Sequence, residues 1–362
     1  MYITEVSGHH QATLAIEQSL KIINPQVTTV NINGFGYVYP IMEKVINKAY
    51  MGVIKRTPGV WDYLYDNPKI AKRLQSIKEM IQKTNHSKLA KLFERVKPTA
   101  VICTQAFPCG LVADYKQSHG LDITLVGVLT DYAPHSYWIH EGVDYYVVPS
   151  QEAREIFIGK GVDEKKIKHL GIPVDPKFTK PLDKKTIAEK LGISPDVATV
   201  LIMGGGQGLG PIKEVVDSLS RSSVDLQMII VAGINKKLIK WLKGAQQKSS
   251  KKIVFFEYAK NIEELMEVAT LIVTKPGGMT TTEALVKGLP MVIVKPLPGQ
   301  EMFNTNFLLS QHVAIRVNQF DQIACEIESL LKTPQKIAAM RQAALNHSNP
   351  NASFDIAKLV LQ

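Results

Sequence analysis

Short apolar runs alternate with helical patterns through the second half of the chain. Each run is four or five residues long and rich in β-branched side chains, and the stretches between the runs place apolar residues at helical spacing. Strands that alternate with helices indicate βαβ units and a parallel sheet. The predicted strands of this half are Thr199–Met203, Met228–Ala232, Ile253–Phe256, Leu271–Thr274, Met291–Val294 and Ala314–Val317.

The first half shows the same alternation with longer gaps. Its predicted strands are Tyr2–Val6, Val27–Ile32, Ala100–Thr104, Ile123–Leu129 and Tyr145–Val148. A polar, proline-rich stretch at 173–181 then predicts a linker. We therefore predict two doubly wound α/β domains that face each other across a cleft, over residues 1–177 and 178–346. Residues 347–362 contain a last amphipathic helix, which we expect to pack back on the first domain.

Residues 35–97 depart from this alternation because they combine helical spacing with many aromatic and basic side chains. Trp61 and Tyr63 lie among them, close to Lys55, Arg56 and Lys69. An amphipathic segment of this composition can lie in a membrane interface. An all-α insertion packed on its own domain would show the same pattern, so both interpretations stay open from the residues alone.

Composition narrows the class of protein. With 362 residues and 45% hydrophobic side chains, the chain suits two ordinary globular domains. Its apolar runs are far shorter than the roughly 18–20 residues that span a bilayer, and no cleavable signal opens it. Three scattered cysteines lack metal-ligand spacing and are expected to be reduced thiols. We therefore expect a cytoplasmic protein.

The net charge of +10 calls for a partner or for ordinary solvated lysine faces. The lysines are spread along helices and no aromatic-and-basic recognition module is present, so we expect no nucleic acid partner. An anionic membrane surface attracts basic proteins by about 1 kcal/mol per well-placed lysine. Both the membrane and the solvated faces remain open at this point.

Two glycine loops follow predicted strands of the second half, at Gly204–Gly210 and at Pro276–Gly278. Loops of this kind let backbone amides approach a phosphate, with a helix N-terminus behind them. The spacing matches neither a P-loop nor a dinucleotide fingerprint. Glu283 lies one turn into the helix after the second loop, where a carboxylate can reach a ribose diol. A solvated helix residue is the alternative for Glu283.

Candidate chemistry in the first half centres on His9. This histidine follows a predicted strand and opens a helix, and its ordinary pKa near 6.5 suits a general base. A lone histidine is more often structural, and that alternative stays open. The chain has no pair of aspartates at D-x-D spacing, so we expect no metal at the site.

Together these motifs resemble the diacylglycerol glycosyltransferases of the monogalactosyldiacylglycerol synthase and processive diacylglycerol glucosyltransferase type. These enzymes are related to the peptidoglycan glycosyltransferase MurG and share its two-domain GT-B fold. The resemblance covers nearly the whole chain, although Val6 stands where the family has its first glycine, so we expect a short first strand or a start upstream. The matching pieces are Gly8–Ala12, Thr130–Trp138, Gly171–Asp175, Gly204–Gly208, Thr274–Glu283 and Pro298–Asn304.

The resemblance implies a role for each motif. Gly205 and Gly206 would lie near the diphosphate of a UDP-hexose, Glu283 would hold the ribose, and Gln300 and Glu301 would contact the sugar. His9 would accept the proton of the acceptor hydroxyl, with Asp131 close by. The remaining donor-site residues would be Gln207, Lys275, Pro276, Gly277, Gly278, Thr282 and Asn304, and the acceptor or membrane contacts would be Trp61, Tyr63, His135 and Trp138.

The resemblance also implies the reaction. Such an enzyme would transfer glucose or galactose from a UDP-sugar to 1,2-diacylglycerol with inversion, without a metal or another cofactor, and would add one or more sugars. It would work at the inner face of the cell membrane as a peripheral protein. Two alternatives stay open: MurG-like transfer of N-acetylglucosamine to a lipid-linked acceptor, and a sensor that binds nucleotide sugars without catalysis.

Overall fold

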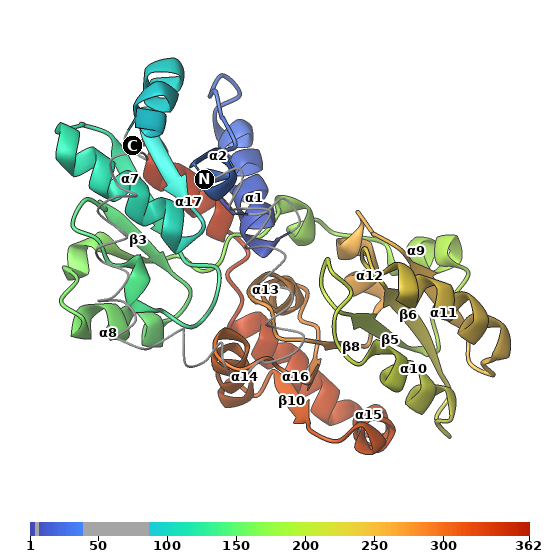
Figure 1. Cartoon of the computed structure of the whole chain (residues 1–362). Helices are drawn as coiled ribbons and strands as arrows, with labels where there is room; N and C mark the ends of the chain where they lie inside the picture. Colours follow the sequence, from blue (N-terminus) through green and yellow to red (C-terminus); the bar gives the residue numbers. More distant parts are fainter. Residues whose placement is uncertain (4–6, 39–86) are drawn as a thin grey trace. The chain divides into compact units, whose positions relative to one another are not determined.

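A computed structural model of the chain describes residues 1–3, 7–38 and 87–362 (Figure 1). Val6, Trp61 and Tyr63, with most of the aromatic and basic segment, lie outside the described residues. The chain forms two compact units. The first comprises Met1–Asp175, Leu297–Gln300 and Asn351–Gln362, and the second comprises Pro176–Pro296 and Glu301–Pro350.

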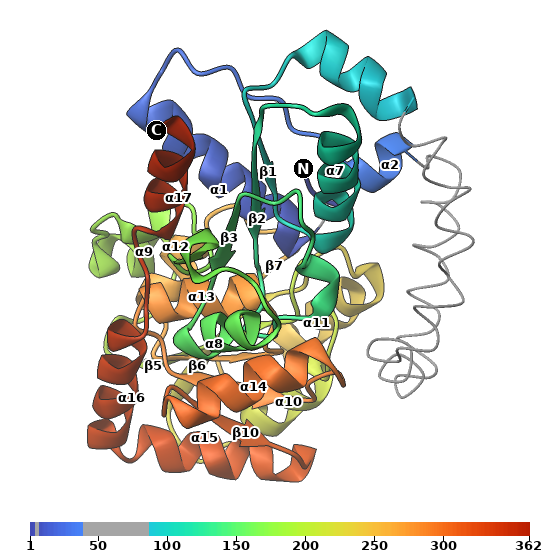
Figure 2. The same cartoon turned by 90° about the vertical axis from the view of Figure 1, so that its left-hand side faces the viewer.

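The first unit contains a four-stranded parallel sheet in the order β1-β2-β3-β4. Both of its faces are covered by helices, so its strands are continuous apolar runs. α1 and α17 pack side by side on one face (Figure 2), and α7 and α8 pack on the other. The elements are α1 (Gly8–Ile23), α2 (Gly34–Val38), β1 (Ala100–Cys103), α7 (Ala106–His119), β2 (Thr124–Val128), β3 (Tyr145–Val148), α8 (Gln151–Gly159), β4 (Ile167–His169) and α17 (Ala352–Leu361).

The chain's first residues lie beside β1. Thr104 N donates to Met1 O at 3.0 Å, and on the other side Tyr2 N donates to Ile32 O at 3.0 Å. This pairing is one bridge long, between Tyr2 and Asn33. The predicted strand Val27–Ile32 is therefore wrong: its residues form no strand, because side chains rather than a backbone ladder hold them. Thr29 and Asn31 donate to the Glu17 carboxylate of α1.

The second unit contains a six-stranded parallel sheet in the order β10-β9-β8-β5-β6-β7. In chain order this is the 3-2-1-4-5-6 arrangement of the dinucleotide-binding fold, with its order reversing between β5 and β8. The strands are β5 (Ala198–Met203), β6 (Leu226–Val231), β7 (Ile253–Phe256), β8 (Leu271–Thr274), β9 (Met291–Val294) and β10 (Ala314–Val317). Ligands of such sheets bind outside the carboxyl ends of the strands at the reversal.

Helices cover both faces of this sheet. α10, α11 and α15 share one apolar core with β5, β6 and β8. The helices are α9 (Lys184–Leu191), α10 (Ile212–Ser220), α11 (Lys236–Lys248), α12 (Ile262–Val268), α13 (Gly278–Val286), α14 (Gln300–Ser310), α15 (Ile323–Leu331) and α16 (Pro334–Asn346). Within the described residues, no helix is both long enough and apolar enough to cross a bilayer.

Candidate active site

His9 lies in the first turn of α1, at the edge of the first sheet where the strands end. Ser7 caps this helix, since its Oγ accepts a hydrogen bond from His10 N at 3.3 Å. The capping residue fixes where the helix begins and therefore where the imidazole is presented. The sequence analysis predicted this position for His9.

Two threonines from neighbouring strand ends hold the imidazole. His9 Nδ1 lies 2.9 Å from Thr104 O, after β1, and 2.8 Å from Thr130 Oγ1, after β2. A carbonyl oxygen can only accept, so Nδ1 carries the proton and donates. In the neutral ring the lone pair then resides on Nε2. The histidine is thereby set in the tautomer that can accept a proton through Nε2.

Burial lowers the pKa of His9 below 6.5, and the hydrogen bond to Thr104 O opposes this shift in part. Burial penalises the charged imidazolium, so the pKa falls. At neutral pH the ring is therefore neutral and ready to accept a proton. Sequence reasoning missed the role of Thr104; its position at the end of the predicted strand Ala100–Thr104 was the available signal.

The other first-unit residues occupy the loop after β2. Asp131 is half-buried, and its Oδ2 accepts a hydrogen bond from Gln300 Nε2 at 3.3 Å; both residues belong to the first unit. His135 is half-buried and packs 6.2 Å from the ring of Trp138, measured between centroids. Trp138 itself is 4% exposed within the core of α7 and β2. This burial corrects the expected membrane contact of Trp138, which instead supports the loop.

The glycine loop after β5 folds back on itself. Gly208 N donates to Gly205 O and Leu209 N to Gly204 O, each at 2.9 Å. These two amide groups donate hydrogen bonds within the loop. They are therefore not available to a phosphate, which corrects the expectation for these two amides. Gly205 and Gly206 are exposed at the tip, and Gln207 is half-buried beside them.

The base of this loop packs tightly on the turn between β6 and α11. A Cβ added to Gly208 would lie 1.9 Å from Ala232 O, and the Gly208 φ of +59° is in the left-handed region. Asn235 Nδ2 also donates to Gly208 O at 2.9 Å. The glycine here is required by close backbone approach as well as by conformation.

We expect Gly208→Ala to destabilise the protein by more than about 3 kcal/mol, because the backbone must move to relieve the clash. Gly205→Ala is the matched control: its φ of +67° is similar, but nothing lies within 4 Å of the added Cβ. The left-handed conformation alone costs about 1–2 kcal/mol. Urea unfolding of both variants measures the difference, and equal losses would contradict the packing argument.

The second glycine loop joins β8 to α13. Gly277 is the N-cap of α13, and Gly278 begins the helix. Two residues predicted to bind the UDP-sugar are buried and form hydrogen bonds with the backbone of this loop. Thr282 Oγ1 donates to Gly278 O at 2.7 Å, and Asn304 Nδ2 donates to Pro276 O at 2.9 Å. Glu283 is half-buried one turn into the helix. The N-terminus of α13 therefore opens at the reversal point of the sheet.

Lys275 brings positive charge to the same place. Its Nζ donates to Glu301 Oε1 at 2.8 Å, and its side chain is 12% exposed. The Lys275 stem packs on Gly210, where an added Cβ would lie 3.4 Å from Cγ and Cδ. The lysine thus connects the glycine loop with α14.

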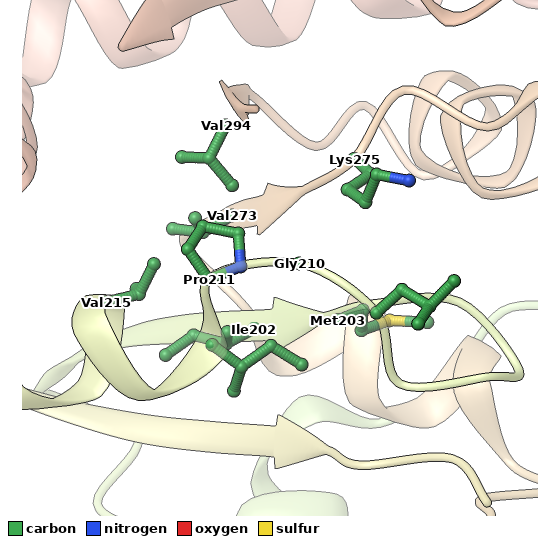
Figure 3. A pocket seen from close by; sticks show the side chains of 10 residues that line it. Ile202, Met203, Gly210, Pro211, Val215, Val273, Lys275 and Val294 are labelled. Carbon is green, nitrogen blue, oxygen red and sulfur yellow. The ribbon is translucent and has the colours of Figure 1, made fainter. Parts of the chain in front are cut away.

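A recess lies at the reversal point of the sheet, between the glycine loop after β5 and the end of β8. Its lining includes Met203, Gly210, Pro211, Val273 and Lys275, with the Nζ of Lys275 directed away from the apolar side chains (Figure 3). The enclosed space is about 10 Å³, which is the room that a single water molecule needs. The recess therefore marks the reversal point of the sheet and does not itself enclose a nucleotide sugar.

The two units carry different chemistry. In the second unit, the N-terminus of α13 and the Lys275 ammonium favour an anion. In the first unit, the neutral His9 favours proton transfer. Among the described residues, no group of three or more His, Cys, Asp or Glu side chains could hold a metal ion.

Residues 9–174 match the family model for monogalactosyldiacylglycerol (MGDG) synthase, and residues 199–360 match that for the glycosyltransferase family 28 C-terminal domain. A processive diacylglycerol beta-glucosyltransferase from Bacillus subtilis (strain 168) is 31% identical over 359 residues, which cover 98% of this chain and 92% of the relative.

Solved structures share the fold at lower identity. MurG from Acinetobacter baumannii has a TM-score of 0.58 at 15% identity, covering 78% of this chain and 77% of that chain. UDP-GlcNAc 2-epimerase from Neisseria meningitidis has a TM-score of 0.63 at 15% identity, covering 99% and 98%. Because transferases and an epimerase share this architecture, the likeness confirms the predicted GT-B fold class without choosing a reaction. The sequence relationship identifies the reaction. The chain belongs to the diacylglycerol glycosyltransferase family and is a glycosyltransferase.

Proposed function

We propose that the protein transfers glucose from UDP-glucose to the free hydroxyl of 1,2-diacylglycerol, giving a β-glucosyl-diacylglycerol. The observation that carries the choice of substrates is the relationship to processive diacylglycerol beta-glucosyltransferases over nearly the full length of both chains. A galactose donor is the second candidate, because the first half matches the model for monogalactosyldiacylglycerol synthase.

In the proposed reaction the diacylglycerol hydroxyl oxygen attacks the anomeric carbon. The bond from that carbon to the β-phosphate oxygen breaks, and UDP leaves with the electron pair. His9 Nε2 accepts the hydroxyl proton, since Nδ1 is occupied by Thr104 O. Attack opposite the leaving group inverts the configuration at the anomeric carbon.

We propose that charge on the departing UDP is stabilised without a metal. The exposed glycine tip, the N-terminus of α13 and the Lys275 ammonium lie at the strand ends where a diphosphate binds in such sheets. Glu283 would bind the ribose, and Gln300 and Glu301 the sugar hydroxyls. Since its acceptor is a lipid, the enzyme would work as a peripheral protein on the cytoplasmic face of the cell membrane.

The test is product formation on diacylglycerol-containing vesicles, with UDP-glucose, UDP-galactose and UDP-N-acetylglucosamine supplied separately, with and without EDTA. We expect transfer from UDP-glucose that EDTA does not reduce. If only UDP-galactose supports transfer, the proposed donor is UDP-galactose and not UDP-glucose. Loss of transfer with EDTA would overturn the metal-free mechanism. UDP-sugar binding without turnover on any lipid would indicate the sensor instead.

A further inference from the structure

The second unit contains a long stretch of sequence that has lysines but no acidic residue. Seven lysines and no acidic residue lie between Asp225 and Glu257. Five of these lysines are on α11, and all five are exposed. They are Lys236, Lys237, Lys240, Lys243 and Lys248.

α11 is amphipathic, and its basic side faces solvent. Leu238, Ile239 and Leu242 are buried in the core against the sheet. Lys236, Lys240 and Lys243 are spaced at i, i+4 and i+7, which places them on one face of the helix. Figure 1 shows α11 as an outer helix of the second unit.

Within the described part of the chain, the lysines of this face are not neutralised by an acidic side chain. Among the described residues, no carboxylate lies within ion-pairing distance of Lys236, Lys240 or Lys243. In contrast, Lys190 and Lys287 of the same unit each pair with a glutamate. An unneutralised stripe of like charge lowers stability through repulsion, and an anionic partner relieves this repulsion.

Apolar and aromatic groups border the stripe. Ile234, just before α11, is 51% exposed. Trp241 is half-buried, with Lys213 Nζ of α10 5.6 Å from its ring centroid. The exposed acids Glu214 and Asp217 on α10 mark where the basic surface ends. A basic helix face with an exposed apolar residue at its end has the composition of an interfacial anchor.

We propose that α11 docks the second unit on the headgroups of an anionic lipid bilayer. Lysine ammonium groups bind phosphate as flexible point charges, and this suits a fluid array of headgroups. A nucleic acid site is less well matched, because α11 shows no exposed aromatic side chain for base stacking. The inference deepens the membrane association in the proposed function, and the vesicle-binding measurement that tests it uses neither donor nor acceptor.

The experiment compares two variants that each lose three positive charges. The test variant replaces Lys236, Lys240 and Lys243 by glutamine. Each variant is sedimented with vesicles of phosphatidylcholine, with and without phosphatidylglycerol, at two salt concentrations. A lysine near an anionic surface contributes about 1 kcal/mol, or about fivefold in binding. We expect the test variant to lose at least tenfold of its partition onto anionic vesicles, with little change on phosphatidylcholine.

The matched control replaces Lys160, Lys180 and Lys336 by glutamine. These lysines are exposed and lie outside α11, so the net charge changes equally but the stripe stays intact. The partition of the control variant onto anionic vesicles is expected to fall by less than about threefold. Equal losses in both variants would overturn the proposal in favour of net charge, and so would tighter wild-type binding to duplex DNA than to anionic vesicles at the same salt.

Activity separates this inference from the proposed function. With diacylglycerol dispersed in detergent, both variants should keep wild-type turnover, and this also shows that they are folded. If the wild type makes no glycolipid, the proposed function fails while the vesicle comparison still tests α11. If the test variant loses turnover in detergent, α11 has a role other than docking.

Discussion

Replacing His9 by alanine is expected to lower kcat by at least about a hundredfold while leaving UDP binding near its wild-type value. General base catalysis by a positioned side chain contributes roughly 10²–10⁴-fold. Nδ1 donates to Thr104 O, so Nε2 is the ring atom available to take a proton. Alanine removes that acceptor and leaves every residue of the second unit unchanged. Steady-state kinetics with UDP-glucose and isothermal titration with UDP separate the two effects.

A matched control for this variant is His119→Ala. His119 Nδ1 also lies 3.0 Å from a backbone oxygen, that of Tyr115, at the C-terminal end of α7. Loss of an equivalent hydrogen bond away from the site should leave kcat unchanged. Turnover of His9→Ala within about threefold of wild type would remove His9 from the mechanism.

The pH profile gives a second measurement on the same residue. Because burial lowers the pKa of His9, more than half of the rings are neutral at pH 6.5, where a free imidazole is half protonated. The acid limb of kcat/KM should therefore lie below pH 6.5. The free energy of unfolding is expected to fall with pH in the same direction. The contribution of the neutral ring to stability is fully present above pH 6.5 and is lost as the pH falls through the lowered pKa. A limb above pH 6.5 would assign the titration to another group.

Lys275→Met is expected to weaken UDP binding by about 10–100-fold and UMP binding by far less. Lys275 lies in the loop that leads into α13, its ammonium is 2.8 Å from Glu301 Oε1, and a hydrogen bond to a charged group contributes about 1.5–3 kcal/mol. UDP carries a second phosphate that UMP lacks, so the ratio of the two affinities reports contact with that phosphate. Isothermal titration with both nucleotides measures it.

Lys287→Met controls for the loss of an ion pair. Lys287 Nζ lies 2.8 Å from Glu267 Oε2, the same distance as in the Lys275–Glu301 pair, and the lysine is 5% exposed. This variant should lower stability while keeping the wild-type ratio of UDP to UMP affinity. If both variants change the ratio equally, the effect of Lys275→Met is structural and the phosphate contact is contradicted.

Much of the second unit could be predicted from the sequence. The strands 253–256, 271–274, 291–294 and 314–317 agree with the prediction residue for residue. Buried parallel strands need apolar side chains on both faces, so they appear as continuous β-branched runs bounded by polar turns. The motif order also indicated the family, which the sequence relationship confirms.

Elements that depend on partners were missed. β4 is only three residues long and has no pattern of its own; its pairing with β3 makes it a strand. The sequence analysis named no helix at residues 300–310, which form α14; its buried Asn304 and Thr305 are polar. Polar residues on the buried face of a helix interrupt the hydrophobic periodicity by which a helix is predicted. Asn304 can be buried because its side chain donates to Pro276 O.

The sequence alone determined the alternation of strands and helices, the glycine loops at strand ends and the presence of His9 at a helix start. Only the tertiary structure decided the tautomer of His9, because Thr104 and Thr130 reach its ring from 95 and 121 residues away. It likewise decided the burial of Trp138 and the ion pair of Lys275 with Glu301. Local propensity acts within a few residues, whereas protonation, burial and charge pairing depend on which strands the fold makes neighbours.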